Sequence, residues 1–242
     1  MEDRLQALNS AALRYGSLIA ALHPRWIVSR LYRFNSEPIV ARSDHDLEEP
    51  GATLSWLGLD KTGDLSVALR EKYQVVADRH WIRWLALSPS GQFPFKLYIS
   101  PSSECLPINF SRALAVAHAR NVPAFKVGLG RRGVARADKL IFYFNNREDL
   151  TACADDLCVK LSHKRVQGVP LTASFCASGL LSWACDPVGI PHSWRTFVTN
   201  ILGRAFSEAR GRPLIDRIKL AKKAALANGI DAERWQLFGS DL

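Results

Sequence analysis

A strand-helix-strand pattern occurs twice in the middle of the chain, and this near-repeat constrains the fold more than any other feature. Each copy opens with an apolar run that contains Lys-Leu, continues through an amphipathic stretch, and returns to an apolar run after Val-Pro. The copies cover residues 95–127 and 139–175, with helices expected at 107–120 and 147–163. Two such units in series predict an α+β fold, namely a ferredoxin-like or related β-α-β repeat sandwich. Its crossovers should be right-handed, with the helices on one face.

Helical additions are expected at both ends of this repeat. Residues 1–34 place apolar side chains at helical spacing until Pro24 interrupts the pattern. Residues 35–64 are acidic and rich in proline and glycine, which predicts a connector or a small peripheral lobe. The remaining expected elements are strands at 81–87 and 179–187, the latter hairpinned to 170–175, and helices at 192–210, 213–228 and 231–238.

Length and composition favour one substantial core. The chain has 242 residues, 48% of them hydrophobic. We expect a helical and loop-rich region over residues 1–92, packed on an α+β core with C-terminal helices over residues 93–242. No apolar run is long enough to cross a bilayer, and the first residues lack a signal-peptide core, so a cytoplasmic protein without membrane contact is expected. The five widely spaced cysteines indicate free thiols and no zinc site, and no cofactor is expected.

The positive charge is concentrated in two segments of the chain. The formal net charge is +9, and basic residues dominate residues 111–147 and 194–226, whereas residues 44–64 are acidic. Such asymmetry steers anionic partners, such as an acidic peptide, a phosphorylated group or nucleic acid. The alternative is a solvated basic surface without a specific partner.

The segment Gly128–Gly133 spells GxGxxG and follows a predicted strand. A dinucleotide site needs a helix to begin there, but only five residues separate Gly133 from the strand that starts at Lys139. No helix of useful length fits, so the sequence argues against a dinucleotide fold. Either the loop is a flexible hairpin, or its amides cradle an anion beside Arg131 and Arg132.

Catalytic motifs of the common hydrolase, metalloprotease and nucleotide-binding kinds are absent, and the six histidines are scattered. Two lysines stand out instead because they interrupt apolar strands. By alternation, Lys96 shares a strand face with Tyr98, and Lys126 shares one with Ala124. Either these lysines occupy an open, solvated face, or they converge with Arg136 and Arg195 on one anion.

The ordered blocks FPFKLYISP, VPAFKVG, ADKLIFYF, GVPLTASF and GLLSWACDP resemble a pattern found in the biosynthesis of ribosomally made, modified peptides. Over about residues 93–205 the chain resembles the peptide-binding proteins of crocagin-type pathways. It is more distantly similar to the HopA-type effector domain, which also serves as the lyase of class V lanthipeptide pathways. For a lyase, the resemblance implies that Lys126 in AFKVG and Arg195 in SWRTF carry the elimination of phosphate. His192 precedes Arg195 instead of lying inside the last long helix, which favours binding over catalysis.

Three functions follow from these patterns. The first is a non-catalytic protein that binds a precursor peptide and presents it to the modifying enzymes of the same pathway. The second is a phosphoserine or phosphothreonine lyase acting on such a peptide, and the third, a minor alternative, is a nucleic-acid binder. The expected peptide or anion site combines strand residues, loop arginines and the start of a helix. Its members are Lys96, Tyr98 and Lys126 on the strands, Arg131, Arg132 and Arg136 in the loop, and Trp194 and Arg195 at the helix start. The sequence makes no prediction of oligomeric state.

Overall fold

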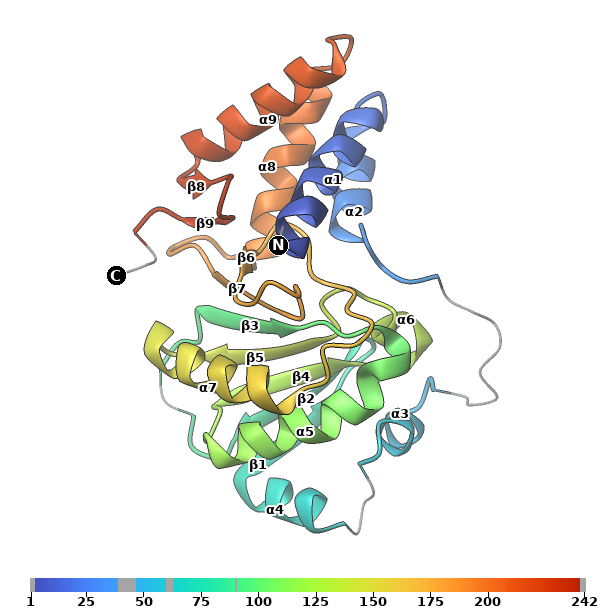
Figure 1. Cartoon of the computed structure of the whole chain (residues 1–242), viewed down its shortest axis with the longest axis vertical. Helices are drawn as coiled ribbons and strands as arrows, with labels where there is room; N and C mark the ends of the chain where they lie inside the picture. The colour runs from blue at the N-terminus through green and yellow to red at the C-terminus, as the bar shows by residue number, and fades with distance from the viewer. Residues whose placement is uncertain (1–2, 39–46, 60–62, 90, 240–242) are drawn as a thin grey trace.

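The computed structural model describes residues 3–38, 47–59, 63–89 and 91–239, which form a sheet layer and a helical lobe (Figure 1). The sheet has seven strands in the order β1-β2-β4-β5-β3-β7-β6, and each strand is antiparallel to its neighbours. Its strands are β1 (Tyr73–Ala77), β2 (Trp81–Ala86), β3 (Phe95–Ile99), β4 (Ala124–Gly128), β5 (Leu140–Phe144), β6 (Ala173–Ser174) and β7 (Leu181–Cys185).

The two predicted repeat units interleave within this sheet. Strands β3 and β4 run parallel with β5 between them, and α5 (Leu106–Ala119) connects them. Strands β5 and β7 run parallel with β3 between them, and α7 (Arg147–Lys160) begins that connection. The α+β prediction is therefore confirmed. The expected return strand over residues 169–175 shrinks to β6, because Leu171 has a positive φ of 62° that breaks the extended backbone.

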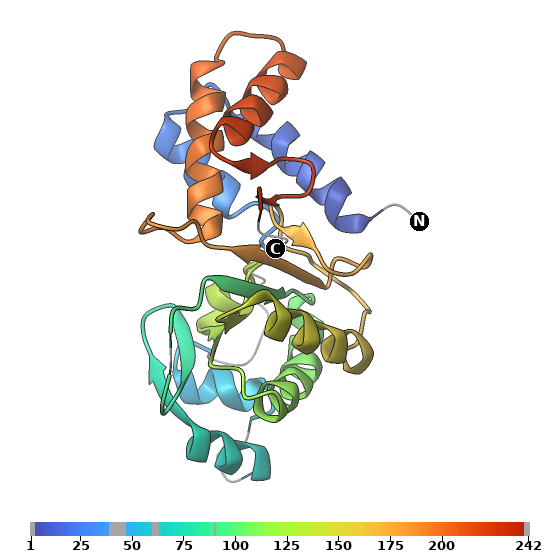
Figure 2. The same ribbon diagram turned by 90° about the vertical axis from the view of Figure 1, so that its left-hand side faces the viewer.

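Alternation along the strands produces two cores, one on each side of the sheet. On one side α5 and α7 pack with the shorter helices α3 (Pro50–Trp56) and α4 (Asp64–Lys72). On the other side lies a lobe of four helices, drawn above the sheet in Figures 1 and 2. These helices are α1 (Arg4–Leu18), α2 (Pro24–Tyr32), α8 (Trp194–Glu208) and α9 (Leu214–Ala227). Residues 1–92 therefore contribute to both layers, through α1 and α2 above and β1 and β2 within the sheet.

One local prediction is wrong, and two others gain detail from the structure. The helix expected at 231–238 is a hairpin of β8 (Ile230–Asp231) and β9 (Gln236–Leu237), because the Asp231 carboxylate accepts the amides of Glu233 and Arg234 and bends the chain. Part of the expected irregular stretch 35–64 is α3, which starts at Pro50, since a first helical turn tolerates proline. Within the GxGxxG segment lies a single helical turn, α6 (Gly130–Val134).

Candidate functional site

The candidate site lies on the sheet face that carries the helical lobe, at the end near β2 where the helices no longer bury the strands. On this face Ala184 and Tyr98 are buried beneath the lobe, whereas Lys126 is half-buried and Arg83 is exposed. Arg83 and Lys126 lie directly opposite each other on β2 and β4. Side chains at opposed positions of antiparallel strands are close neighbours, so two cations meet at the open part of the sheet.

Lys126 occupies an aromatic environment. Its Nζ lies 4.1 Å from the centroid of the Trp81 ring and 5.4 Å from that of Tyr143. A hollow of about 270 Å³ opens beside it, with Arg83 and Phe93 also in its wall. Burial lowers the pKa of Lys126 to about 8, and the positive charges of its neighbours contribute to the shift while Asp138 opposes it. Near pH 8 a large share of this amine is neutral, which is the state that accepts a proton.

A buried carboxylate organises the cations behind Lys126. Asp138 accepts hydrogen bonds from Arg136 Nε at 2.8 Å and from the Tyr32 hydroxyl at 3.2 Å, and it pairs with Arg195 Nη1 at 2.8 Å. The two guanidinium groups hold the pKa of Asp138 well below its usual range, although its burial acts in the opposite direction. Arg195 also donates to the main-chain oxygen of Tyr32 at 2.5 Å. Asp138 therefore fixes Arg136 at the edge of the lobe.

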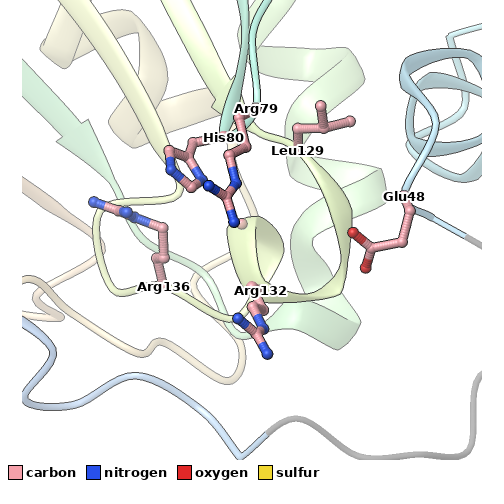
Figure 3. Close-up of a pocket in the computed structure, with 7 residues that line it drawn as sticks. Glu48, Arg79, His80, Leu129, Arg132 and Arg136 are labelled. Carbon is pink, nitrogen blue, oxygen red and sulfur yellow. The ribbon is translucent and has the colours of Figure 1, made fainter.

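A second hollow, of about 340 Å³, is lined largely by basic side chains (Figure 3). Its wall contains Arg79 and His80 from the β1–β2 turn and Arg132 and Arg136 from α6 and the residues after it, and Glu48 approaches from the other side. The Cζ of Arg136 lies 4.6 Å from the centroid of the Trp81 ring. Since Lys126 contacts the same ring, Trp81 connects the amine to the arginines.

The glycines of the GxGxxG segment bring α6 against β4. A Cβ on Gly128 would lie 2.3 Å from the main-chain oxygen of Gly133, so only glycine permits this approach. The amide of Gly128 donates to the main-chain oxygen of Lys139 at 2.8 Å, which joins the turn to the start of β5. The motif thus packs a short turn against a strand and sets the positions of Arg132 and Arg136.

The other predicted site residues lie in different surroundings. Lys96 is buried and forms an ion pair with Asp186, and its Nζ lies 5.7 Å from the centroid of the Tyr143 ring. Tyr98 is buried beneath the lobe. Trp194 is buried too, with its indole Nε1 donating to the main-chain oxygen of Leu171 at 2.7 Å. The indole therefore contributes to the core and not to a surface that a peptide could touch.

Among the cations, Lys126 and Arg136 come together at Trp81, whereas Arg195 is only 3% exposed and its guanidinium is engaged by Asp138 and the main-chain oxygen of Tyr32. Arg131 lies half-buried on α6, next to the exposed Arg132. The predicted positions therefore divide into a group at the open face and a group inside the core.

Several site residues were not singled out from the sequence, namely Tyr32, Arg79, His80, Trp81, Arg83 and Tyr143. Trp81 and Arg83 did carry a signal, because a two-residue alternation in a predicted strand places them on one face. Tyr143 follows by the same argument on β5. Tyr32 and the β1–β2 turn reach the site only through tertiary packing, which sequence spacing does not reveal.

A metal site and a membrane-spanning helix are both absent from the described part of the chain. Its histidines, cysteines and carboxylates form no group of three with the arrangement of a metal site. Likewise, none of its helices has the length and apolar character required of a membrane span.

Two solved structures share this fold over nearly the whole chain. One is the effector protein from Pseudomonas syringae pv. tomato strain DC3000, which is 16% identical, with a TM-score of 0.57 over 96% of this chain and 98% of that one. The other is the effector protein from Pseudomonas syringae pv. syringae strain 61, which is 15% identical, with a TM-score of 0.60 over 97% and 99% of the two chains. The phosphothreonine lyase OspF from Shigella flexneri matches more weakly, at 13% identity and a TM-score of 0.40 over 66% of this chain and 90% of its own.

At such identities the two effector structures establish the fold alone. No model of a known protein family and no curated protein matches the chain. The expected likeness to an effector domain is confirmed at the level of the fold. The resemblance to crocagin-type peptide binders stays a prediction.

Proposed function

We propose that this protein is a phosphoserine or phosphothreonine lyase that acts on a peptide. The observation that carries the proposal is Lys126, whose pKa is lowered to about 8 at the mouth of a hollow bordered by Arg83 and Tyr143. Removal of an α-proton needs a base that is neutral near the working pH, and a buried lysine meets that need. Departure of phosphate needs positive charge nearby, which Arg83 and Arg136 supply.

In the proposed step the neutral Nζ of Lys126 takes the α-proton of the phosphorylated residue. The C–H electron pair becomes the Cα=Cβ double bond, the Cβ–O bond breaks, and phosphate leaves with its electron pair. The products are a dehydroamino acid within the peptide and free phosphate, so the step balances without a further reactant. The lysine must lose its proton again before the next turnover.

Arg195 has a positioning role in this scheme. It is buried and paired with Asp138, and Asp138 in turn fixes Arg136 through two hydrogen bonds. Arg195 therefore acts through its neighbours, and the cation that meets the leaving phosphate is Arg136. This assignment modifies the sequence-based expectation that Lys126 and Arg195 form the catalytic pair.

Mass spectrometry of a phosphopeptide incubated with the purified protein tests the proposal. The expected product is lighter by one phosphoric acid, and Lys126→Met should abolish its formation. Lys160→Met is the matched control, because Lys160 is exposed at the end of α7 on the opposite side of the sheet. Full activity in Lys126→Met, or no elimination from any of a panel of phosphoserine and phosphothreonine peptides, would contradict the proposal.

The second candidate is a precursor-peptide binder without catalysis. One observation favours it: β1 is an edge strand, with Val75 and Val76 exposed at 41% and 42%. Extended peptides bind such edges through main-chain hydrogen bonds. Calorimetry with an unphosphorylated precursor peptide should then give a dissociation constant in the micromolar range or below, with no change in the peptide's mass. For the minor nucleic-acid alternative, binding to random duplex that vanishes at moderate salt would indicate charge attraction only.

A further inference from the structure

A cleft of about 770 Å³ lies at one side of the helical lobe, between the lobe and the region of α6. One wall comes from α2 and α8, with Arg25, Val28 and Arg33 among its residues, and the other comes from the region of α6. This cleft and the smaller arginine-lined hollow share His80, Arg132 and Arg136, so the two adjoin. A ligand in the smaller hollow could therefore extend into the cleft between α2, α8 and the region of α6.

The charge of this cleft is strongly one-sided. Within the described ranges, no ion pair with a carboxylate is found for three of its arginines, namely Arg25, Arg33 and Arg132, nor for Arg79 of the adjoining hollow. The two carboxylates in the larger cleft already have partners. Asp138 holds Arg136 and Arg195, while Glu37 accepts from the Ser103 amide at 2.9 Å and lies 4.0 Å from Lys139 Nζ. The cleft therefore offers guanidinium groups that an incoming anion can pair with.

We infer that this cleft binds the acidic flank of the peptide substrate, so that the helical lobe selects peptides with Asp or Glu residues on one side of the phosphorylated residue. The inference rests on the proposed function for the location of the reacting residue. The shape favours an extended chain, because the two hollows adjoin, and Arg136, which lines both, contacts the same Trp81 ring as Lys126. Arginine forks bind carboxylates in a bidentate manner, and Val28 and Ala135 supply apolar surface for the side-chain stems.

Binding measurements test this inference without any turnover. The probes are two fluorescent, unphosphorylated peptides that differ only in one flank, which carries Glu and Asp in the first and Gln and Asn in the second. We expect the acidic peptide to bind at least about tenfold more tightly at low salt. In the double variant Arg25→Glu, Arg132→Glu that preference should disappear. Arg30→Glu, Lys223→Glu is the matched control, with the same change in net charge but both positions outside the cleft.

Three outcomes would overturn the inference. The first is equal affinity for the two peptides, and the second is an equal loss of affinity in the control variant, which would show a general effect of charge. The third is tighter binding of a random oligonucleotide than of the acidic peptide, because the cleft would then fit a nucleic acid better. Circular dichroism of each variant checks that the fold is retained.

The inference and the proposed activity fail in different ways. If the acidic peptide is preferred but no phosphopeptide loses phosphate, the cleft assignment holds and the lyase proposal falls. If phosphopeptides with acidic and neutral flanks are converted with equal kcat/KM, the lyase proposal holds and the cleft assignment falls. The wild-type protein and the same two sequences in phosphorylated form suffice for this comparison.

Discussion

The Nζ of Lys126 lies 4.1 Å from the centroid of the Trp81 ring, at the point where the sheet emerges from beneath the helical lobe. The contact has two opposing effects on the amine. The electron-rich ring face favours the charged form, whereas the burial that accompanies it favours the neutral form. Burial dominates, because the pKa of Lys126 falls to about 8. Trp81 therefore holds the Lys126 amine at the open part of the sheet, where the amine can lose its proton.

Replacing this lysine should stabilise the protein while it abolishes function. The folded-state pKa of about 8 lies below the ordinary value of 10.5, so the buried amine carries a cost that is fully present below pH 8. That cost diminishes as pH rises from about 8 to 10.5, where only the unfolded chain stays protonated. At pH 7, Lys126→Met should unfold with a free energy about 1 to 3 kcal/mol higher than wild type. Urea titrations at pH 7 and pH 10 measure this difference, which should shrink at the higher pH. A less stable variant at pH 7 would contradict it.

The rate of phosphate elimination should rise with pH to a plateau. The active form of Lys126 is the neutral amine, so kcat/KM should follow a single titration with an apparent pKa of about 8. The phosphopeptide titrates near pH 6, far enough away to be separated in the same profile. Initial rates from roughly pH 4 to pH 10, which is about two units beyond the substrate and lysine values, provide the measurement. A rate that falls through pH 8 would assign Lys126 a different role.

Asp138 should be the residue on which the site's stability depends most. Asp138→Asn leaves Arg195, which is 3% exposed, without its anion, and breaking a buried ion pair costs roughly 3 to 5 kcal/mol. Because the folded-state pKa of Asp138 is lowered, its contribution is present above about pH 4 and is lost as pH falls further. The variant should therefore unfold more easily at pH 7 and lose less stability on acidification than wild type does. Asp156→Asn, at an exposed pair with Arg120, is the control and should leave the urea midpoint nearly unchanged.

The sequence predicted the sheet better than the site. The strands around Leu97, Phe125 and Phe142 were predictable because each is a short apolar run between turn or helix signals. The open-face position of Lys126 also followed, because strand alternation fixes side-chain direction. The burial of Arg195 and Trp194 did not follow, since the start of an amphipathic helix looks the same whether or not another layer covers it. Their partners, Asp138 and Leu171, are distant in sequence and are joined to them only by the packing of α8 on the sheet.

A methyl group at Gly128 should displace the arginines of the smaller hollow. In Gly128→Ala the new Cβ would meet the main-chain oxygen of Gly133 at 2.3 Å, so α6 must move away from β4. Overpacking of this kind costs roughly 1 to 3 kcal/mol. We also expect weaker binding of acidic peptides, since Arg132 and Arg136 move with α6. Gly51→Ala is the control, because its Cβ would meet nothing within 4 Å. Equal stability of the two variants would show that the contact between Gly128 and Gly133 is dispensable.

Arg83 should tune the base without being needed for the fold. It faces Lys126 across β2 and β4, and its positive charge is one of the causes of the lowered pKa of Lys126. Arg83→Gln removes that charge, so the charged form of Lys126 becomes less unfavourable and its pKa rises. The ascending limb of the pH–rate profile should consequently move to higher pH, and the plateau should also fall, because Arg83 contributes positive charge near the leaving phosphate. The exposed pair of Arg83 with Asp78, at 2.5 Å, contributes at most about 1 kcal/mol, so the unfolding midpoint should hardly change.

The control is Arg30→Gln, on the far side of α2, which removes the same charge from the chain and should leave the ascending limb of the pH–rate profile in place. If both variants shift the limb equally, net charge and not the pairing of Arg83 with Lys126 sets the pKa of the base.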